Sequence, residues 1–179
     1  IAENCMLRGA HVTLVNASVS VEPPMFVDVV NVTSAADMAD VVKSKAAEQD
    51  IIIMTAAVAD FCPSHPADEK IKKNDSSYEA VIELERTEDI LSYLGAHKAK
   101  GQLICGFSME TQNMLENSKA KLAKKNADMI VANNLKVAGA GFGTDTNVVT
   151  LITADDCTEL EIMDKSCVAA RIMDRLLQM

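Results

Sequence analysis

IIIMTAAVAD occupies residues 51–60, and its first eight residues are apolar apart from one threonine. A continuous apolar run of this length is typical of a strand at the centre of a parallel sheet that helices cover on both faces. We therefore predict a strand over residues 51–58. Ligands of open α/β sheets bind outside the carboxyl ends of the strands, so Asp60 is a candidate ligand contact. An aspartate at this place could equally cap the next turn.

Helical and strand patterns alternate on both sides of this run. Upstream we predict a helix over residues 1–8, strands over 11–16 and 27–32, and a helix over 34–48 that Ser34 caps. Downstream we predict strands over 80–84, 101–107, 129–132 and 148–152, and helices over 88–98, 111–126 and 168–177. Helices between strands indicate a Rossmann-like, doubly wound α/β fold with a mainly parallel sheet.

The start of the sequence indicates an incomplete βαβ unit. A helix that ends at Gly9 and feeds a strand is the second half of such a unit, so we expect the first strand and its loop to lie upstream of Ile1 and to be missing here. The length of 179 residues fits one domain. We predict a single nucleotide-binding domain over residues 1–179, truncated at its N-terminus.

Composition excludes several classes of function. The formal net charge of −9 opposes general nucleic-acid binding, and 3% aromatic residues leave few platforms on which bases could stack. The five cysteines are widely spaced and form no C-x-x-C pair, which argues against a disulfide framework or a zinc site and favours the cytoplasm. The longest apolar run is too short to span a bilayer, so we expect no membrane partner.

Lysines gather in two places of this acidic chain. The sequence EKIKKN over residues 69–74 contains Lys70, Lys72 and Lys73, which could neutralise charge on a polyphosphate or could form a solvated flap. Lys121 and Lys125 are four residues apart on one face of a predicted helix. Like charges at this spacing are slightly destabilising, and a bound polyphosphate would reverse that cost.

Glycines occur in two further stretches. GFSMET over residues 106–111 lies where a buried strand ends and a helix begins, and a helix N-terminus favours anions. Residues 139–147 contain a G-x-G-x-G spacing, but a strand pattern follows it and no helix pattern does. This second stretch is therefore interpreted as a loop before a strand, and not as a dinucleotide-binding turn.

The order of these motifs resembles one known family. AAVADF, EKIKKN, GFSMET, KLAKKNADMIVANN and GFGTDTN follow one another in residues 56–147 as they do in bacterial phosphopantothenoylcysteine synthetases. The resemblance covers essentially the whole chain. In many bacteria this enzyme is the C-terminal half of a bifunctional flavoprotein, so FMN would belong only to a possible upstream decarboxylase domain.

The resemblance implies an activity and its ligands. Members of the family are homodimeric ligases that use CTP with Mg²⁺ or Mn²⁺ to join 4′-phosphopantothenate to L-cysteine in coenzyme A synthesis. The carboxylate attacks the α-phosphate to give an acyl-cytidylate, which the amine of cysteine then opens. We expect the triphosphate to hold the metal, with no confident protein side-chain ligand.

The resemblance also implies site residues, with Lys70 matching the lysine that assists catalysis. The positions that match nucleotide contacts are Met54, Thr55, Ala56, Asp60, Phe61, Lys70, Glu85, Arg86, Thr87, Glu88, Phe107, Lys121 and Lys125. Possible contacts to substrate or phosphate are Lys72, Lys73 and Asn133. We expect Asp60 and the lysines at positions 70, 121 and 125 to converge on one pocket.

The family also carries an N-terminal loop of the form N-x-S-S-G-K-M-G, which does not occur before Ile1. We therefore expect this polypeptide alone to lack full activity. Two alternatives are a nicotinamide-dependent reductase, for which no Tyr-x-x-x-Lys pair is present, and a nucleotide-binding or dimerisation module without activity. A close relative that uses ATP is a smaller variation.

Overall fold

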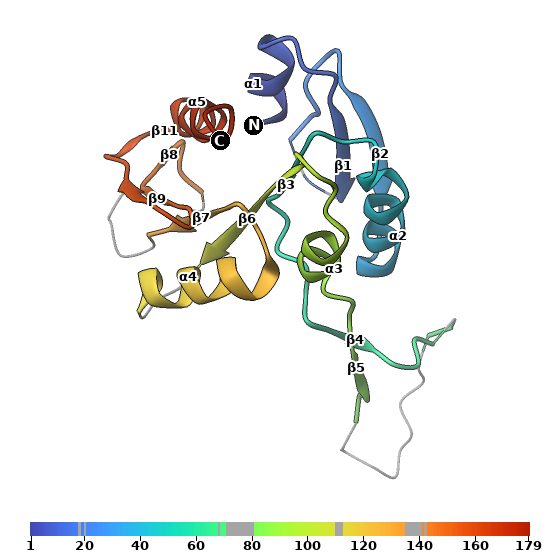
Figure 1. Cartoon of the computed structure of the whole chain (residues 1–179). Helices are drawn as coiled ribbons and strands as arrows, with labels where there is room; N and C mark the ends of the chain where they lie inside the picture. The colour runs from blue at the N-terminus through green and yellow to red at the C-terminus, as the bar shows by residue number, and fades with distance from the viewer. Residues whose placement is uncertain are drawn as a thin grey trace.

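A five-stranded sheet lies at the centre of the computed structural model, which describes residues 1–17, 19, 21–67, 69–70, 81–109, 113–134, 141 and 143–179. Its strand order is β10-β9-β7-β6-β3. The strands are β3 (Ile51–Met54), β6 (Leu103–Met109), β7 (Met129–Asn133), β9 (Val149–Ile152) and β10 (Cys157–Glu159). β3, β6 and β7 are parallel, and β9 and β10 are antiparallel to their neighbours. The predicted α/β class with a mainly parallel sheet is confirmed (Figure 1).

Helices cover both faces of this sheet. On one face, α5 (Lys165–Leu176) packs Val168, Ile172 and Leu176 against β7 and β9. On the other face, α2 (Ala35–Ala46) and α3 (Ile90–His97) form a second cluster with Ile104 of β6. Because both faces are covered, residues 129–132 of β7 are completely buried.

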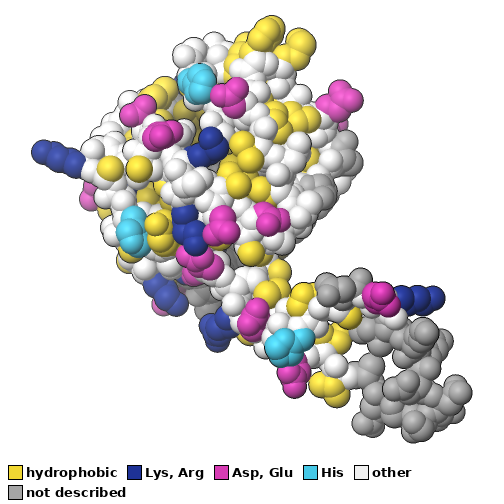
Figure 2. All heavy atoms as spheres, turned by 90° about the vertical axis from the view of Figure 1, so that its right-hand side faces the viewer, with side chains coloured by type: hydrophobic (Ala, Val, Ile, Leu, Met, Phe, Trp, Pro, Cys, Tyr) yellow, Lys and Arg dark blue, Asp and Glu magenta, His cyan; other side chains and the backbone are white. Residues whose placement is uncertain are grey.

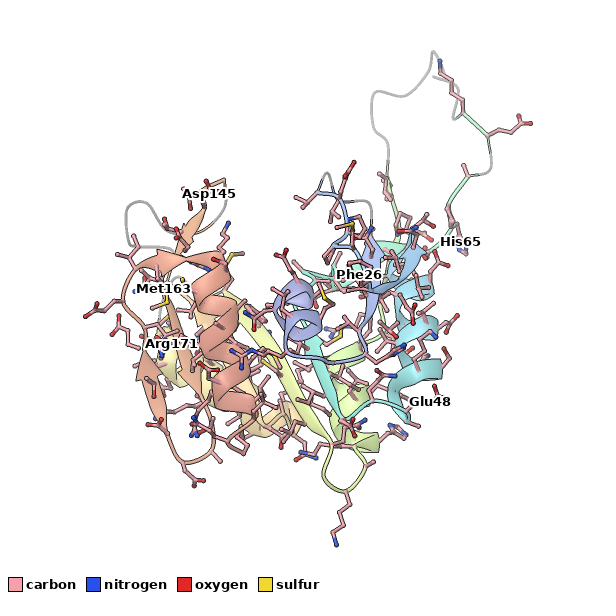
Figure 3. All side chains as sticks on the ribbon, turned by 90° about the horizontal axis from the view of Figure 1, so that it is seen from above. Phe26, Glu48, His65, Asp145, Met163 and Arg171 are labelled. Atoms are coloured by element: carbon pink, nitrogen blue, oxygen red, sulfur yellow. The ribbon has the colours of Figure 1, made fainter. Side chains whose placement is uncertain are left out.

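The N-terminal segment forms a separate two-stranded unit. α1 (Ala2–Leu7) leads through Gly9, whose φ is 85°, into β1 (Thr13–Ala17), which pairs in parallel with β2 (Asp28–Val32). Arg8 ties α1 to α5 through an ion pair with Asp174 at 2.7 Å, and Figure 3 shows these two helices on the same side of the sheet. A cavity of about 160 Å³ separates β1 from β3, and α2 closes part of it.

The predicted strand over residues 51–58 is too long. Pairing with β6 ends at Met54 and Gly106, and from Thr55 onward the chain leaves the sheet. β3 lies at the end of the five-stranded order and is only partly buried, whereas the apolar pattern favoured a central strand. Its apolar character is explained by the cover on both of its faces. Ile51 and Ile53 pack against the cluster that contains α5, and Ile52 and Met54 pack against the cluster of α2 and α3.

Short strands were missed or displaced. The strand predicted over residues 80–84 shares only Leu84 with the observed strand, and residues 81–83 lie outside it. β4 (Phe61–Pro63) and β5 (Leu84–Arg86) form an antiparallel hairpin that projects from the body (Figures 1 and 2), with His65 on the projecting segment in Figure 3. β8 (Thr146–Asn147) and β11 (Met163–Asp164) form another small pair, and β10 was missed as well. These strands have two or three residues and little burial, so an apolar pattern cannot fix their positions.

Element boundaries otherwise move by a few residues. The helix predicted over 168–177 begins at Lys165, and the strand predicted over 101–107 runs from Leu103 to Met109. α4 (Met114–Lys125) ends one residue before its predicted limit. Residues 71–80, with Lys72 and Lys73, and most of the glycine-containing stretch 135–142 lie outside the described residues. None of the helices in the described part of the chain has the length and apolar character that crossing a bilayer would require.

The start of α2 is fixed by a capping box. The hydroxyl of Ser34 accepts a hydrogen bond from the backbone N–H of Asp37 at 3.0 Å, and the Asp37 carboxylate accepts one from the backbone N–H of Ser34 at 2.9 Å. Hydrogen bonds that the Asp37 carboxylate accepts from Thr33 and Ser34 hold the pKa of Asp37 below its ordinary value. The cap predicted from Ser34 is therefore confirmed.

We predict that Ser34→Ala lowers the free energy of unfolding by about 1 kcal/mol, because the orphan N–H at the start of α2 loses its acceptor. Urea unfolding followed by circular dichroism measures this difference. Ser44→Ala is the matched control: Ser44 lies inside the same helix and bonds back to the carbonyl of Val41. That change should be neutral or slightly stabilising, because alanine is the better helix former. Equal losses in both variants would contradict the assigned role of the cap.

Candidate nucleotide-binding site

A cavity of about 260 Å³ lies where β3 and β6 meet the start of α3 and the side of α4. It occupies the place where a ligand of an open α/β sheet is expected, outside the carboxyl end of β3. The sequence-predicted residues that line it are Met54, Ala56, Asp60, Thr87, Glu88, Phe107, Lys121 and Lys125. Two parts of the chain that are more than 60 residues apart in sequence, 54–60 and 121–125, thus border one space.

Small residues form the floor of this cavity near β3. After Met54 the chain continues through Ala56, Val58 and Ala59 to Asp60, and all of these residues line the cavity. Two hydrogen bonds hold this segment in place: the N–H of Thr87 donates to the carbonyl of Asp60 at 3.0 Å, and the hydroxyl of Thr87 donates to the carbonyl of Ala59. Small side chains let a ligand come close to backbone groups here.

Lys121 lies on the α4 side of the cavity. Its ammonium group donates a hydrogen bond to the carbonyl oxygen of Phe107 at 2.9 Å. Among the described residues this lysine has no carboxylate partner. Its ammonium group thus borders the cavity and is held there by a neutral backbone carbonyl.

Lys125 is held more firmly than Lys121, one helical turn further along α4. Its side chain is 12% exposed, and its ammonium group forms an ion pair with Asp89. It also donates to the hydroxyl of Ser92 at 3.0 Å. Asp89 itself caps α3, because its carboxylate accepts the N–H of Ser92 at 3.0 Å. One carboxylate thus serves the helix and the lysine together.

The environment of Asp89 lowers its pKa. Burial acts in the opposite direction, but the hydrogen bonds from Lys125 and Ser92 and the charge of Lys125 outweigh burial. Asp89 is therefore ionised at neutral pH. Its contribution to folding stability is complete above its unfolded-state pKa of about 3.9 and is lost as the pH falls through the lower folded-state value.

Charges around the cavity are nearly balanced before any ligand binds. Asp60, Glu88 and Asp89 bring three negative charges, and the two lysines bring two positive charges. Lys43 of α2 pairs with Glu88 at 2.7 Å, and this bond raises the pKa of Lys43. Within the described part of the chain, Asp60 and Lys121 are then the lining charges without an opposite charge as partner.

Other sequence-predicted residues lie outside this cavity. Thr55 lines the cavity between β1 and β3, and Asn133 accepts a hydrogen bond from the Asn147 side chain at 2.9 Å at the end of β7. Phe61, Glu85 and Arg86 belong to the β4–β5 hairpin, where the guanidinium of Arg86 lies 5.5 Å from the centre of the Phe61 ring. Lys70 follows this hairpin's first strand, is exposed and does not line the cavity. The structure therefore brings Asp60 and the two helical lysines together, without Lys70.

Three polar residues of this site were not predicted: Asp89, Ser92 and Lys43. Asp89 and Ser92 have the three-residue spacing of a helix cap and its first turn, and this signal could have placed them at the sheet's carboxyl edge. Lys43 carried no comparable signal, because its pairing with Glu88 depends on how α2 and α3 pack.

The described residues offer no ready-made metal site, since no three His, Cys, Asp or Glu side chains among them come together in a suitable group. A cation that enters with a polyphosphate needs fewer protein ligands, because phosphate oxygens and water complete its coordination. The Asp60 carboxylate at the cavity is a hard oxygen ligand of the type that Mg²⁺ prefers. The site therefore fits a metal that arrives with its substrate.

The sequence of the chain matches a known protein family. All of residues 1–179 match the DNA/pantothenate metabolism flavoprotein C-terminal domain. The chain belongs to this family. It is 44% identical to the coenzyme A biosynthesis bifunctional protein CoaBC of Bacillus subtilis (strain 168) over 178 residues, which are 98% of this chain and 43% of that protein. The chain thus spans less than half the length of this curated relative.

Solved structures agree with this family assignment. The crystal structure of the C-terminal domain of a CoaBC protein is 41% identical, has a TM-score of 0.81 and is matched over 99% of this chain and 80% of that one. A Cab2 mutant solved in complex with phosphopantothenate-cysteine has a TM-score of 0.63 at 17% identity, over 86% of this chain and 54% of that one. At this low identity the second likeness shows the fold alone. The domain of the family therefore has the fold described above.

We predict that Lys125→Met raises the pKa of Asp89, because burial of the carboxylate remains while the neighbouring charge is lost. Titration of the side-chain carboxyl carbon by NMR measures this change. Lys124→Met is the matched control, since Lys124 is exposed on the same helix. An Asp89 pKa that stays the same in Lys125→Met would show that the ion pair does not form in solution.

Proposed function

We propose that this chain is the nucleotide-binding part of a ligase that joins 4′-phosphopantothenate to L-cysteine at the expense of CTP. The observation that carries the proposal is the gathering of Asp60, Lys121 and Lys125 around one cavity at the carboxyl edge of the sheet. Such an arrangement suits a nucleoside triphosphate, whose ribose needs a hydrogen-bond acceptor and whose phosphates need cations.

Family membership supports the choice of reaction. The relatives of this family named CoaBC act in coenzyme A biosynthesis, and phosphopantothenate-cysteine is bound in the Cab2 mutant of the same fold. That compound is the product of the proposed ligation. The free cysteines Cys5, Cys62, Cys105, Cys157 and Cys167 carry no disulfide, and we place the reaction in the cytoplasm.

The proposed reaction has two steps. A carboxylate oxygen of 4′-phosphopantothenate forms a bond to the α-phosphorus of CTP, and pyrophosphate leaves with the electrons of the broken P–O bond. The amine nitrogen of cysteine then forms a bond to the acyl carbon and loses a proton, while CMP leaves. Neither step needs a nucleophilic side chain, so the cysteines of the chain have no part in it.

The two helical lysines oppose the main barrier, which is the approach of a carboxylate to a polyanion. Among the described residues Lys121 has no carboxylate partner, and the ammonium group of Lys125 is fixed by its ion pair with Asp89. Fixed charges in a partly enclosed site stabilise a developing anion by several kcal/mol. A divalent cation, Mg²⁺ or Mn²⁺, would add charge neutralisation near Asp60 when it arrives with the triphosphate.

Lys70 would act from the projecting hairpin. The cavity of about 260 Å³ lies just below the range of roughly 300–1,000 Å³ that is usual for ligand pockets, so it would enclose only part of a nucleotide. The rest would extend toward the base of the hairpin at Thr87 and Asp60. We propose that Lys70 contacts the phosphates when the hairpin approaches them, and that Lys72 and Lys73 assist.

The same hairpin supports a homodimer. Phe61 of β4 is 50% exposed and Leu84 of β5 is 59% exposed, and just before β5 Val81 is 87% and Ile82 71% exposed. Figure 2 shows hydrophobic side chains along this projection. Exposed apolar groups gathered on one element mark an interaction surface, and we propose that a second copy of the chain covers it.

We predict that CTP with Mg²⁺ binds this chain and that NADPH does not. Lys121→Met and Lys125→Met should each weaken CTP binding by roughly ten-fold to a hundred-fold, because a hydrogen bond to a charged group is worth about 1.5–3 kcal/mol. Isothermal titration calorimetry measures the dissociation constants, and Lys124→Met serves as the control on the exposed side of α4. Binding of NADPH in place of CTP would refute the proposed ligase.

We predict that the protein sediments as a dimer, at about twice its mass of 19.3 kDa. The double change Ile82→Lys with Leu84→Lys should give monomers, because it places charges in the proposed apolar contact. Val21→Lys is the control, since Val21 is 75% exposed on a different segment. Analytical ultracentrifugation separates the two states, and a dimer that survives the double change would exclude the hairpin as the contact.

A further inference from the structure

Helices α3 and α4 touch at a point where no side chain fits. A Cβ atom placed on Gly95 of α3 would overlap the carbonyl oxygen of Lys125 and would lie 2.8 Å from the carbonyl carbon of the same residue. Both are backbone atoms, so no rotation of a side chain could relieve the overlap. Gly95 is buried, and its missing side chain is what permits this approach.

The contact is fastened by the residue that ends α4. Asn126 adopts the left-handed conformation with φ of 48°, and its side-chain amide donates to the carbonyl of Gly95 at 2.7 Å. Lys98, just after α3, pairs with Asp128 at 2.8 Å on the same side. The end of α4 is therefore tied to α3 by backbone packing, an amide hydrogen bond and an ion pair.

Both the backbone and the ammonium group of Lys125 contact α3 or its cap. Its backbone rests on Gly95, and its ammonium group reaches Ser92 and Asp89. Positions 89, 92 and 95 are three residues apart, so they lie along one side of the helix and its cap. The Lys125 side chain runs along this side of α3. The distance between the Lys125 backbone and Gly95 therefore sets where the Lys125 ammonium group lies in the cavity.

We propose that Gly95 is a positioning residue for the nucleotide site, because the close approach that it allows sets where the ammonium group of Lys125 lies. This inference rests on the proposed function for its consequence in binding, and on the α3–α4 geometry alone for its structural part. Gly95 does not line the cavity. It acts only through Lys125.

The expected effect of a single added methyl group is large for its size. Gly95→Ala must push the end of α4 away from α3, and a displacement of about 1 Å at a binding group can cost about a hundred-fold in function. We expect Gly95→Ala to raise the dissociation constant for CTP with Mg²⁺ by about ten-fold. Ala96→Ser, which adds one atom at the exposed neighbouring position, should leave it unchanged.

A double-mutant cycle separates positioning from general damage. The dissociation constant for CTP with Mg²⁺ is measured for the unchanged protein, Gly95→Ala, Lys125→Met and the double variant. If Gly95 acts through Lys125, Gly95→Ala weakens binding about ten-fold in the unchanged protein and less than two-fold when Lys125 is methionine. Equal factors in both backgrounds, or no effect in either, would overturn the inference.

A second readout does not depend on nucleotide binding. Moving Lys125 away from Asp89 removes part of what lowers the carboxylate pKa, so the Asp89 pKa in Gly95→Ala should rise in an NMR titration. An unchanged Asp89 pKa would overturn the inference even if CTP did not bind. Failure of the proposed function looks different: CTP binding would be indifferent to Lys121→Met and Lys125→Met while the Asp89 pKa still rose.

A milder variant guards against loss of folding in Gly95→Ala. Asn126→Gly keeps the left-handed helix end, which glycine adopts without strain, and removes the amide bond to Gly95. It should weaken CTP binding two-fold to five-fold and raise the Asp89 pKa, with an unchanged far-UV circular dichroism spectrum. A folded Asn126→Gly protein with native CTP affinity and a native Asp89 pKa would count against the proposed positioning.

Discussion

Parallel pairing of β3 with β6 is the constraint on which the rest of the site depends. The register joins Ile51 to Leu103 and continues to Met54 and Gly106, where it stops. Beyond that point β6 continues along β7, while the chain after β3 turns away toward Asp60. The space opened by this divergence is the cavity, and the helices that precede and follow β6 supply its walls. A different register would bring different side chains to the divergence.

Under the proposed function this acidic chain binds an anion, so its few cations must not be neutralised by its many carboxylates. In this structure, two of the lysines form ion pairs with particular carboxylates, and a third is held by a backbone carbonyl. Lys43 forms an ion pair with Glu88, and Lys125 forms one with Asp89. Lys121 instead donates a hydrogen bond to a backbone carbonyl, which carries no net charge. In the described part of the chain, the carbonyl of Phe107 thus holds the ammonium group of Lys121 with no carboxylate to neutralise it.

Local sequence carried the features that depend on neighbours in the chain. Ser34 has the side chain of a helix cap, Lys121 and Lys125 have helical spacing, and the run from Ile51 indicates a strand. The features that could not be predicted depend on contacts between residues far apart in the sequence. The partnership of Asp89 with Lys125 requires two helices to meet at Gly95, and nothing near Gly95 in sequence signals a backbone 30 residues away. The place of Lys70 depends on the direction of a hairpin whose strands have three residues each, too short to show a pattern.

The separation of the β1–β2 pair from the main sheet has a consequence for how the molecule behaves in solution. Within the described part of the chain, β1 and β3 each turn an edge toward the cavity between them, and neither pairs across it. Edges with free N–H and C=O groups are templates for any extended polypeptide. The two facing edges therefore present the backbone groups that an added extended segment would need to pair as a strand between them.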